Sequence, residues 1–132
     1  MAIQLSVEQR NARLNAIETT LGTAPLLQIF TGPAPANTAA ANNGTLLCNM
    51  TLPSDWANDA ANGAKAKNGT WQANASNNGT AGHFRMFIAN ATRCDVQGTA
   101  GSGANDLVLD NAVIATNQVI TITAFTLTDG NP

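Results

Sequence analysis

Apolar residues recur at helical spacing only near the start of the chain, which predicts a helix over residues 6–21. Ser6 is a suitable N-cap and Gly22 a suitable C-cap. The apolar stripe of this helix consists of Val7, Leu14, Ile17 and Leu21. A helix this short is marginal alone in water, so we expect it to lie on the chain's own sheet or on a neighbouring molecule.

After Gly22 the pattern changes to short apolar runs, several of them alternating with polar residues and separated by Asn, Gly and Pro. In the last run the apolar phase shifts after Ile122, which predicts a β-bulge around Thr123 and Ala124. Between the runs, residues 53–69 are expected to form a long irregular connection. The predicted strands cover residues 26–31, 45–52, 70–72, 81–89, 93–98, 107–109 and 119–128.

About seven to eight short antiparallel strands with turns between them, preceded by one N-terminal α-helix, predict a mainly β fold. A β-sandwich or jelly roll is the architecture that such a pattern favours. We expect residues 1–22 to form an N-terminal helical arm and residues 23–132 to form the β-sandwich domain. A chain of 132 residues is long enough for one such core.

Charged residues make up only 11% of the chain, against about 25% in an average soluble domain. The six Lys and Arg residues are spread thinly, so the sequence does not indicate nucleic-acid binding. No apolar run approaches the roughly 20 residues of a transmembrane helix. The first residues lack the pattern of a signal peptide, and we therefore expect folding in a cytoplasm.

Residues with catalytic potential are few and lack a recognisable motif. His83 is the single histidine, and we interpret it as structural or surface-exposed. Asp95, Asp106 and Asp110 form the densest acidic region, for which a calcium site is the alternative to turn capping. The sequence therefore predicts no catalytic residues, no cofactor and no metal site.

Contact residues are predicted on the helix and at the two tryptophans. Trp56 and Trp71 are candidates for an interface or a glycan-stacking surface, with core packing as the alternative. Arg10 and Arg13 lie off the apolar stripe, where they either face solvent or contact an acidic patch on a neighbouring subunit. The residues assigned to an interface are Arg10, Arg13, Leu14, Ile17, Leu21, Trp56 and Trp71.

Two cysteines, Cys48 and Cys94, lie far apart and show no metal-ligand spacing. Buried free thiols and a disulfide between facing strands are the two interpretations of this pair. The sequence alone does not decide between them.

Several segments resemble small virion proteins of tailed bacteriophages. They are MAIQLSV at 1–7, RNARL at 10–14, AIET at 16–19, LPSDW at 52–56, GTAGHFR at 79–85 and FTLT at 125–128. The resemblance spans nearly the whole chain and implies a non-enzymatic virion structural protein that assembles in the cytoplasm of a bacterial host.

Size, strand content and low charge suggest a capsid decoration (cement) protein, with the helix as an arm anchored by Leu14, Ile17 and Leu21. Its expected partners are the major capsid protein or other virion proteins. Self-association into a dimer or trimer is also expected. One alternative is a collar, tail or fibre module with a receptor- or glycan-binding surface. Another is a small glycan-degrading enzyme.

Overall fold

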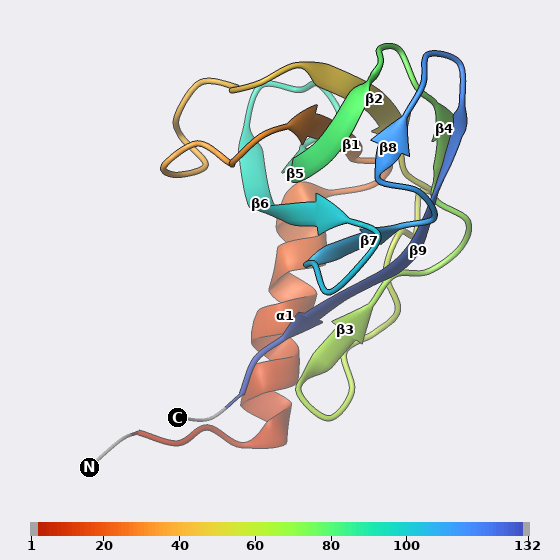
Figure 1. The fold of residues 1–132 in the computed structure, drawn as a ribbon. Helices are drawn as coiled ribbons and strands as arrows, with labels where there is room; N and C mark the ends of the chain where they lie inside the picture. Colours follow the sequence, from red (N-terminus) through yellow and green to blue (C-terminus); the bar gives the residue numbers. More distant parts are fainter. Residues whose placement is uncertain (1–2, 131–132) are drawn as a thin grey trace.

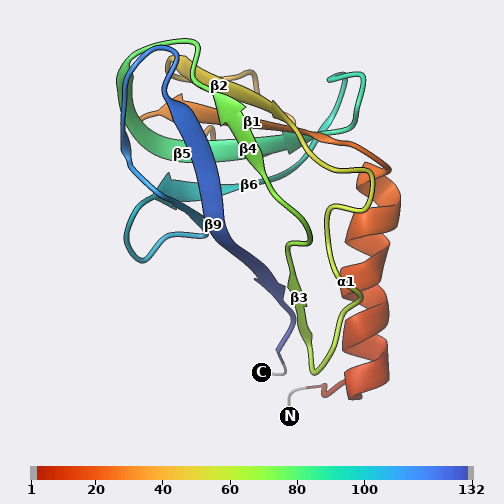
Figure 2. The ribbon, with the colours of Figure 1, turned by 90° about the vertical axis from the view of Figure 1, so that its right-hand side faces the viewer.

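The computed structural model describes residues 3–130 and shows one helix and a single curled sheet (Figure 1). The helix lies beside the sheet, and the last part of the chain runs down toward the level at which the helix begins (Figure 2). The elements are α1 Val7–Leu21, β1 Leu26–Thr31, β2 Leu46–Thr51, β3 Ala64–Ala66, β4 Gln72–Asn74, β5 Gly79–Phe87, β6 Cys94–Gly101, β7 Leu107–Leu109, β8 Val113–Ile114 and β9 Val119–Thr128.

Both predicted caps of α1 are confirmed. The Ser6 hydroxyl accepts a hydrogen bond from the Gln9 backbone N–H, which satisfies one of the free donors at the helix start. Gly22 ends the helix at φ +81° and ψ −166°, a conformation that favours glycine, and its N–H donates to the Glu18 carbonyl. Of the two environments expected for the helix, the structure shows it on the chain's own sheet.

The strands form one sheet in the order β2-β1-β5-β6-β7-β9-β3, with β4 paired to β9 and β8 paired to β5. The sheet curls so strongly that β2, at one end of the strand order, comes next to the segment that follows β4. There the Ser76 backbone N–H donates to the Leu47 carbonyl at 2.8 Å. The mainly β class and the N-terminal helix are thus confirmed, in the form of a curled mixed sheet.

The expectation of a purely antiparallel sheet is wrong for β6 and β7, which pair in parallel. Parallel neighbours usually need a crossover of a dozen or more residues. Here only Ala100 with Leu107 and Gly101 with Val108 are paired, so the chain returns by a very short distance through residues 102–106. Asp106 holds this return, since its carboxylate accepts the Thr99 N–H at 2.9 Å.

The predicted bulge in β9 is confirmed. Val108 pairs with Ala124 and Leu109 pairs with Ile122, so Thr123 is the extra residue. Ile122 and Phe125 are consequently both buried although they differ by an odd number of positions. The apolar residues before and after the bulge therefore face the same core.

Three other strand predictions need correction. The connection over 53–69 contains β3, which pairs with β9, and β8 is a further short strand beside β5. β6 continues to Gly101, through residues expected to be a loop. Gly98 permits this close packing, because a Cβ there would lie 2.7 Å from the Asp106 carboxylate and 3.0 Å from the Phe84 ring.

The core lies inside the curl of the sheet and is centred on aromatic rings. Trp71 and Phe125 have ring centroids 5.5 Å apart, and Phe84 meets Phe125 edge to face at 5.6 Å. Trp56 packs on Trp71 at 6.1 Å. Such pairs add to the free energy gained from apolar burial.

Candidate functional site

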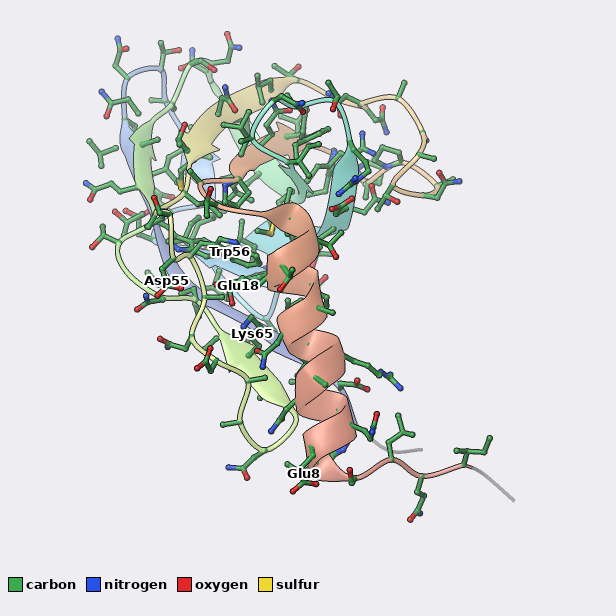
Figure 3. All side chains as sticks on the ribbon, turned by 180° about the vertical axis from the view of Figure 1, so that it is seen from behind. Glu8, Glu18, Asp55, Trp56 and Lys65 are labelled. Atoms are coloured by element: carbon green, nitrogen blue, oxygen red, sulfur yellow. The ribbon has the colours of Figure 1, made fainter. Side chains whose placement is uncertain are left out.

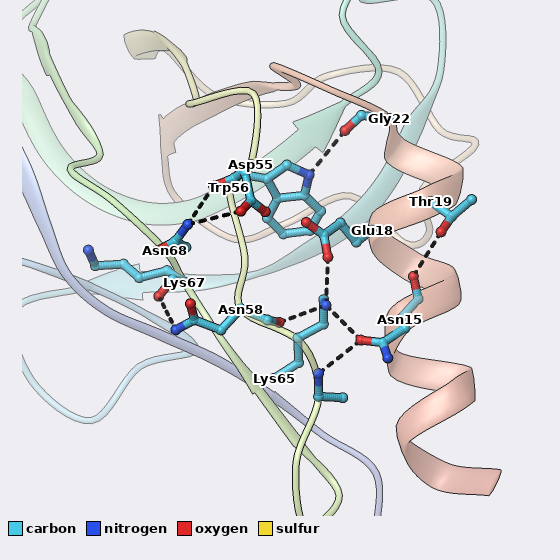
Figure 4. Close-up of polar contacts among 11 residues, drawn as sticks. Asn15, Glu18, Thr19, Gly22, Asp55, Trp56, Asn58, Lys65, Lys67 and Asn68 are labelled. Atoms are coloured by element: carbon cyan, nitrogen blue, oxygen red, sulfur yellow. Dashed lines mark hydrogen bonds and ion pairs between the residues drawn. The ribbon is translucent and has the colours of Figure 1, made fainter. Parts of the chain in front are cut away.

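The attachment of α1 to the sheet depends on a buried lysine, Lys65 of β3 (Figure 3). Its ammonium group lies 2.7 Å from the Glu18 carboxylate and donates to the Asn15 side-chain carbonyl and the Asn58 backbone carbonyl, both at 2.8 Å (Figure 4). An ammonium has three N–H donors, and these three oxygens match them. The charge is therefore buried with a complete set of partners.

Other polar contacts continue this attachment along the helix. The side-chain carbonyl of Asn11 accepts the Gly63 backbone N–H at 2.9 Å, and that of Asn15 accepts the Ala60 N–H at 2.9 Å. The turn before β3 thus satisfies its backbone donors on amide side chains of α1.

Arg10 and Arg13 both reach Asp129, just after β9. Arg13 forms an ion pair with the Asp129 carboxylate at 2.8 Å, and Arg10 donates to the Asp129 backbone carbonyl at 3.1 Å. Solvent and an acidic patch on a neighbouring subunit are the two alternatives predicted for these residues, and the structure instead provides an acidic partner within the same chain. The sequence could not indicate this pair, because Arg13 and Asp129 are 116 positions apart.

The predicted apolar anchors of the helix are mostly used inside the molecule. Leu14 and Leu21 are each 2% exposed, so their side chains are not available to a partner in this structure. Ile17 is half-buried and lines a surface cleft. As a group, the anchors explain how α1 packs on its own sheet.

Both tryptophans occupy the core, which favours the core interpretation over the interface and glycan interpretations. Trp56 and Trp71 are fully buried. The Trp56 indole N–H donates to the Gly22 carbonyl at 3.1 Å and so ties the end of α1 to the core. The Trp71 indole N–H donates to the Asn68 carbonyl at 3.0 Å. Each ring therefore has a satisfied polar edge without a partner molecule.

Residues 32–45, here called the strap, cross the outer face of β5 and β6. Three side chains of these strands hold it. His83 Nδ1 lies 2.8 Å from the Gly32 carbonyl, Gln97 donates to the Pro35 carbonyl at 2.9 Å, and Arg85 donates to the Thr38 carbonyl at 2.7 Å. A carbonyl only accepts, so Nδ1 of His83 is the donor in this contact. The expected structural histidine is confirmed, in a buried position.

Arg85 is the functional candidate that the sequence analysis missed. It is 1% exposed, and the carboxamide of Asn42 is its second neutral partner. Its Nε has no hydrogen-bond partner among the described residues. The alternating pattern of residues 81–89 gave no sign of this, because burial of that face depends on the strap.

A cleft of about 830 Å³ opens between α1, the strap and the start of β6. Arg13, Arg85 and Arg93 line it, and Asp95 is its single acidic residue. Arg93 and Asp95 form an ion pair at 2.6 Å, and Arg93 also donates to the Thr20 carbonyl at the end of α1. The apolar and small lining residues are Ala16, Ile17, Ala39, Ala40, Ala41, Phe87, Cys94 and Val96.

The three carboxylates considered for calcium have separate structural tasks. Asp95 pairs with Arg93, Asp106 accepts from Thr99, and Asp110 accepts from the Thr121 backbone N–H. Within residues 3–130, no group of three or more His, Cys, Asp or Glu side chains is placed to hold a metal ion.

Both cysteines are buried free thiols, which is one of the two interpretations of the pair. Burial raises the pKa of the Cys48 thiol to about 11. Burial also raises the pKa of the Cys94 thiol, and the nearby Arg85 guanidinium partly opposes this shift. Low thiolate content predicts low reactivity of Cys48 in the folded protein.

Comparison of the chain with protein-family models, curated proteins and solved structures gives no match. In the part of the chain that the structure describes, no helix is long and apolar enough to cross a bilayer.

Proposed function

We propose that this chain is a non-enzymatic structural protein of a tailed-bacteriophage virion, where it stabilises the capsid as a decoration protein. The resemblance of its sequence segments to small virion proteins supports the type of particle. In this proposal the partner is the major capsid protein or another virion protein, and copies of the chain associate as a dimer or trimer. In this proposal the curled sheet, rather than a sandwich or jelly roll, is the rigid body of the decoration protein.

The observation that carries the proposal is how the chain uses its few charges. The ion pairs Lys65–Glu18 and Arg13–Asp129 join α1 to the sheet, and Arg93–Asp95 lies where β6 meets the helix end. Ion pairs of this kind hold the helix and the strands in fixed positions, so the scaffold is rigid. Exposed Asn, Thr and Ala side chains then provide a surface that costs less to desolvate against another protein than a charged surface would.

Exposed apolar side chains are available at two distant parts of the molecule. Ile3 and Val7 are 82% and 37% exposed at the start of α1, and Val113 and Val119 are 68% and 45% exposed at β8 and the start of β9. The start of α1 and β8 lie at opposite ends of the molecule (Figure 1). A protein with a contact at each end is suited to bridging two neighbouring capsid subunits.

The features that suggested a glycan-binding module or a glycosidase have other roles in the structure. A glycan-stacking surface at Trp56 and Trp71 requires exposed rings, whereas both are fully buried. A glycosidase at Asp95, Asp106 and Asp110 requires a carboxylate held in an apolar pocket, whereas these groups accept hydrogen bonds or pair with Arg93.

The test is co-sedimentation of the purified chain with capsids that lack it. We expect saturable binding at a copy number comparable with that of the major capsid protein. Ile3→Asp and Val113→Asp should each weaken binding by at least about tenfold, because each places a charge in a buried contact. Ser102→Asp, in the exposed loop after β6, is the matched control. A chain that stays in the supernatant at every concentration would contradict the proposal.

A further inference from the structure

Arg85 carries a buried charge without a counterion. Among residues 3–130, the ion pairs use Arg13, Lys65 and Arg93. Arg85 contacts neutral groups instead, namely oxygens of Thr38 and Asn42 and the Cys94 thiol. Its ring contact is with Phe87, 5.5 Å from the guanidinium carbon. A guanidinium keeps its proton in proteins, and a buried charge is normally paired. An anion is the partner that this position lacks.

The cleft beside Arg85 has the size and composition of a ligand site. Its volume of about 830 Å³ falls in the range of roughly 300–1,000 Å³ that is usual for small-molecule pockets. Three of the six cationic residues line it, with Asp95 as the one acid. Arg13 is already paired with Asp129, and Arg93 with Asp95, so one positive charge remains uncompensated.

The walls define the rest of the ligand. Ile17, Phe87 and Val96 are apolar, and the strap adds three consecutive alanines, residues 39–41. One uncompensated guanidinium matches a monoanion, and its planar donors suit the two oxygens of a carboxylate. The buried Nε–H of Arg85 has no hydrogen-bond partner among the described residues, and Arg85 lines the cleft. A phosphate dianion would bring more charge than the cleft can neutralise.

We propose that this cleft binds a monocarboxylate with an apolar body, of the medium-chain acyl type, and that Arg85 receives the carboxylate. The apolar chain lies against Ile17, Phe87 and Val96. The same chemistry is found at the carboxyl terminus of an apolar peptide. This site does not depend on the proposed virion role, which concerns the two ends of the molecule.

The test is an NMR titration of the ¹⁵N-labelled chain with octanoate. We expect saturable shifts of backbone amides in residues 39–42 and 94–96. Octanol, which lacks the charge, should bind at least about tenfold more weakly. Acetate and inorganic phosphate should give no saturable shift, because they lack the apolar body. Acetyl-Leu-Val with a free carboxyl end is the peptide probe, and its amidated form is the control without the charge. Tighter binding of the free peptide than of octanoate would indicate a peptide source, and tighter binding of octanoate an acyl source.

Two variants locate the site. Ala16→Trp, on the exposed side of α1, places a large side chain in the cleft while keeping Arg85 itself, and should weaken octanoate binding at least about tenfold. Ala12→Trp, exposed on the same helix but outside the cleft, should bind octanoate as the unmodified chain does. Arg85→Met should abolish the preference for octanoate over octanol.

Three results would overturn the proposal. They are absence of saturable octanoate binding up to about 10 mM, far above the range of specific sites; equal affinity for octanol and octanoate; and unchanged affinity in Ala16→Trp. The last variant decides the matter even where Arg85→Met fails to fold.

Discussion

Lys65→Met should destabilise the protein strongly, because it removes a buried cation that joins β3 to α1. The Lys65 side chain is 0% exposed, and it contacts Glu18, Asn15 and Asn58. The substitution leaves the Glu18 carboxylate without its partner in a mostly buried site. Breaking a buried ion pair from one side costs about 3–5 kcal/mol.

The lower end of that range applies here, since the Glu18 side chain keeps 23% exposure and can be partly rehydrated. We therefore expect a loss of about 3 kcal/mol in the free energy of unfolding. For a chain of 132 residues, 1 kcal/mol corresponds to about 4 °C, so the melting temperature should fall by about 12 °C. Urea unfolding followed by tryptophan fluorescence measures this directly, because Trp56 and Trp71 are both in the core.

Two further variants make the measurement specific. Lys67→Met, two residues along the chain, removes a lysine bonded to the Gly69 carbonyl and lying over the Trp71 ring, and should cost about 1 kcal/mol or less. Lys65→Met combined with Glu18→Met removes both charges and should recover stability to within about 1–2 kcal/mol of the original chain. A loss below about 1 kcal/mol for Lys65→Met alone would refute the reasoning.

Two other predictions concern Cys48 and the contact between the strap and β5. Burial raises the pKa of the Cys48 thiol to about 11 in the folded chain, against an ordinary value of 9.0 for a thiol in the unfolded chain. As pH rises, the unfolded state therefore loses this proton first. The free energy of unfolding should fall between pH 9 and pH 11. Urea unfolding across this range should show a smaller fall for Cys48→Ala than for the original chain. Gly82→Ala should destabilise by about 1–3 kcal/mol because its Cβ would lie 2.3 Å from the Gly32 carbonyl oxygen, whereas Gly103→Ala, with no neighbour within 4 Å, should leave thermal unfolding nearly unchanged.

The sequence predicted the elements whose signals are local. Ser6 and Gly22 marked the ends of α1, and the phase shift after Ile122 marked the bulge of β9. β1, β7 and β9 follow the predicted ranges. Caps, turns and alternation depend on neighbouring residues, so they can be recognised without tertiary structure.

The missed features depend on residues far apart in the chain. β3 is only Ala64–Ala66, and its identity as a strand comes from pairing with the end of β9. Burial of Lys65 requires Glu18, 47 positions earlier. Burial of Arg85 requires Thr38 and Asn42 in the strap. A lysine or arginine in a polar segment predicts a solvated side chain until such partners are placed.

The most direct test of the proposed function is a cryo-EM map of the virion that carries this chain. The account predicts density for the curled sheet across joints between capsid subunits, with the start of α1 and the β8 end in contact with different neighbours. Density restricted to the neck or tail would contradict the decoration role and retain a structural one. Absence of the chain from every purified particle would contradict the virion assignment altogether.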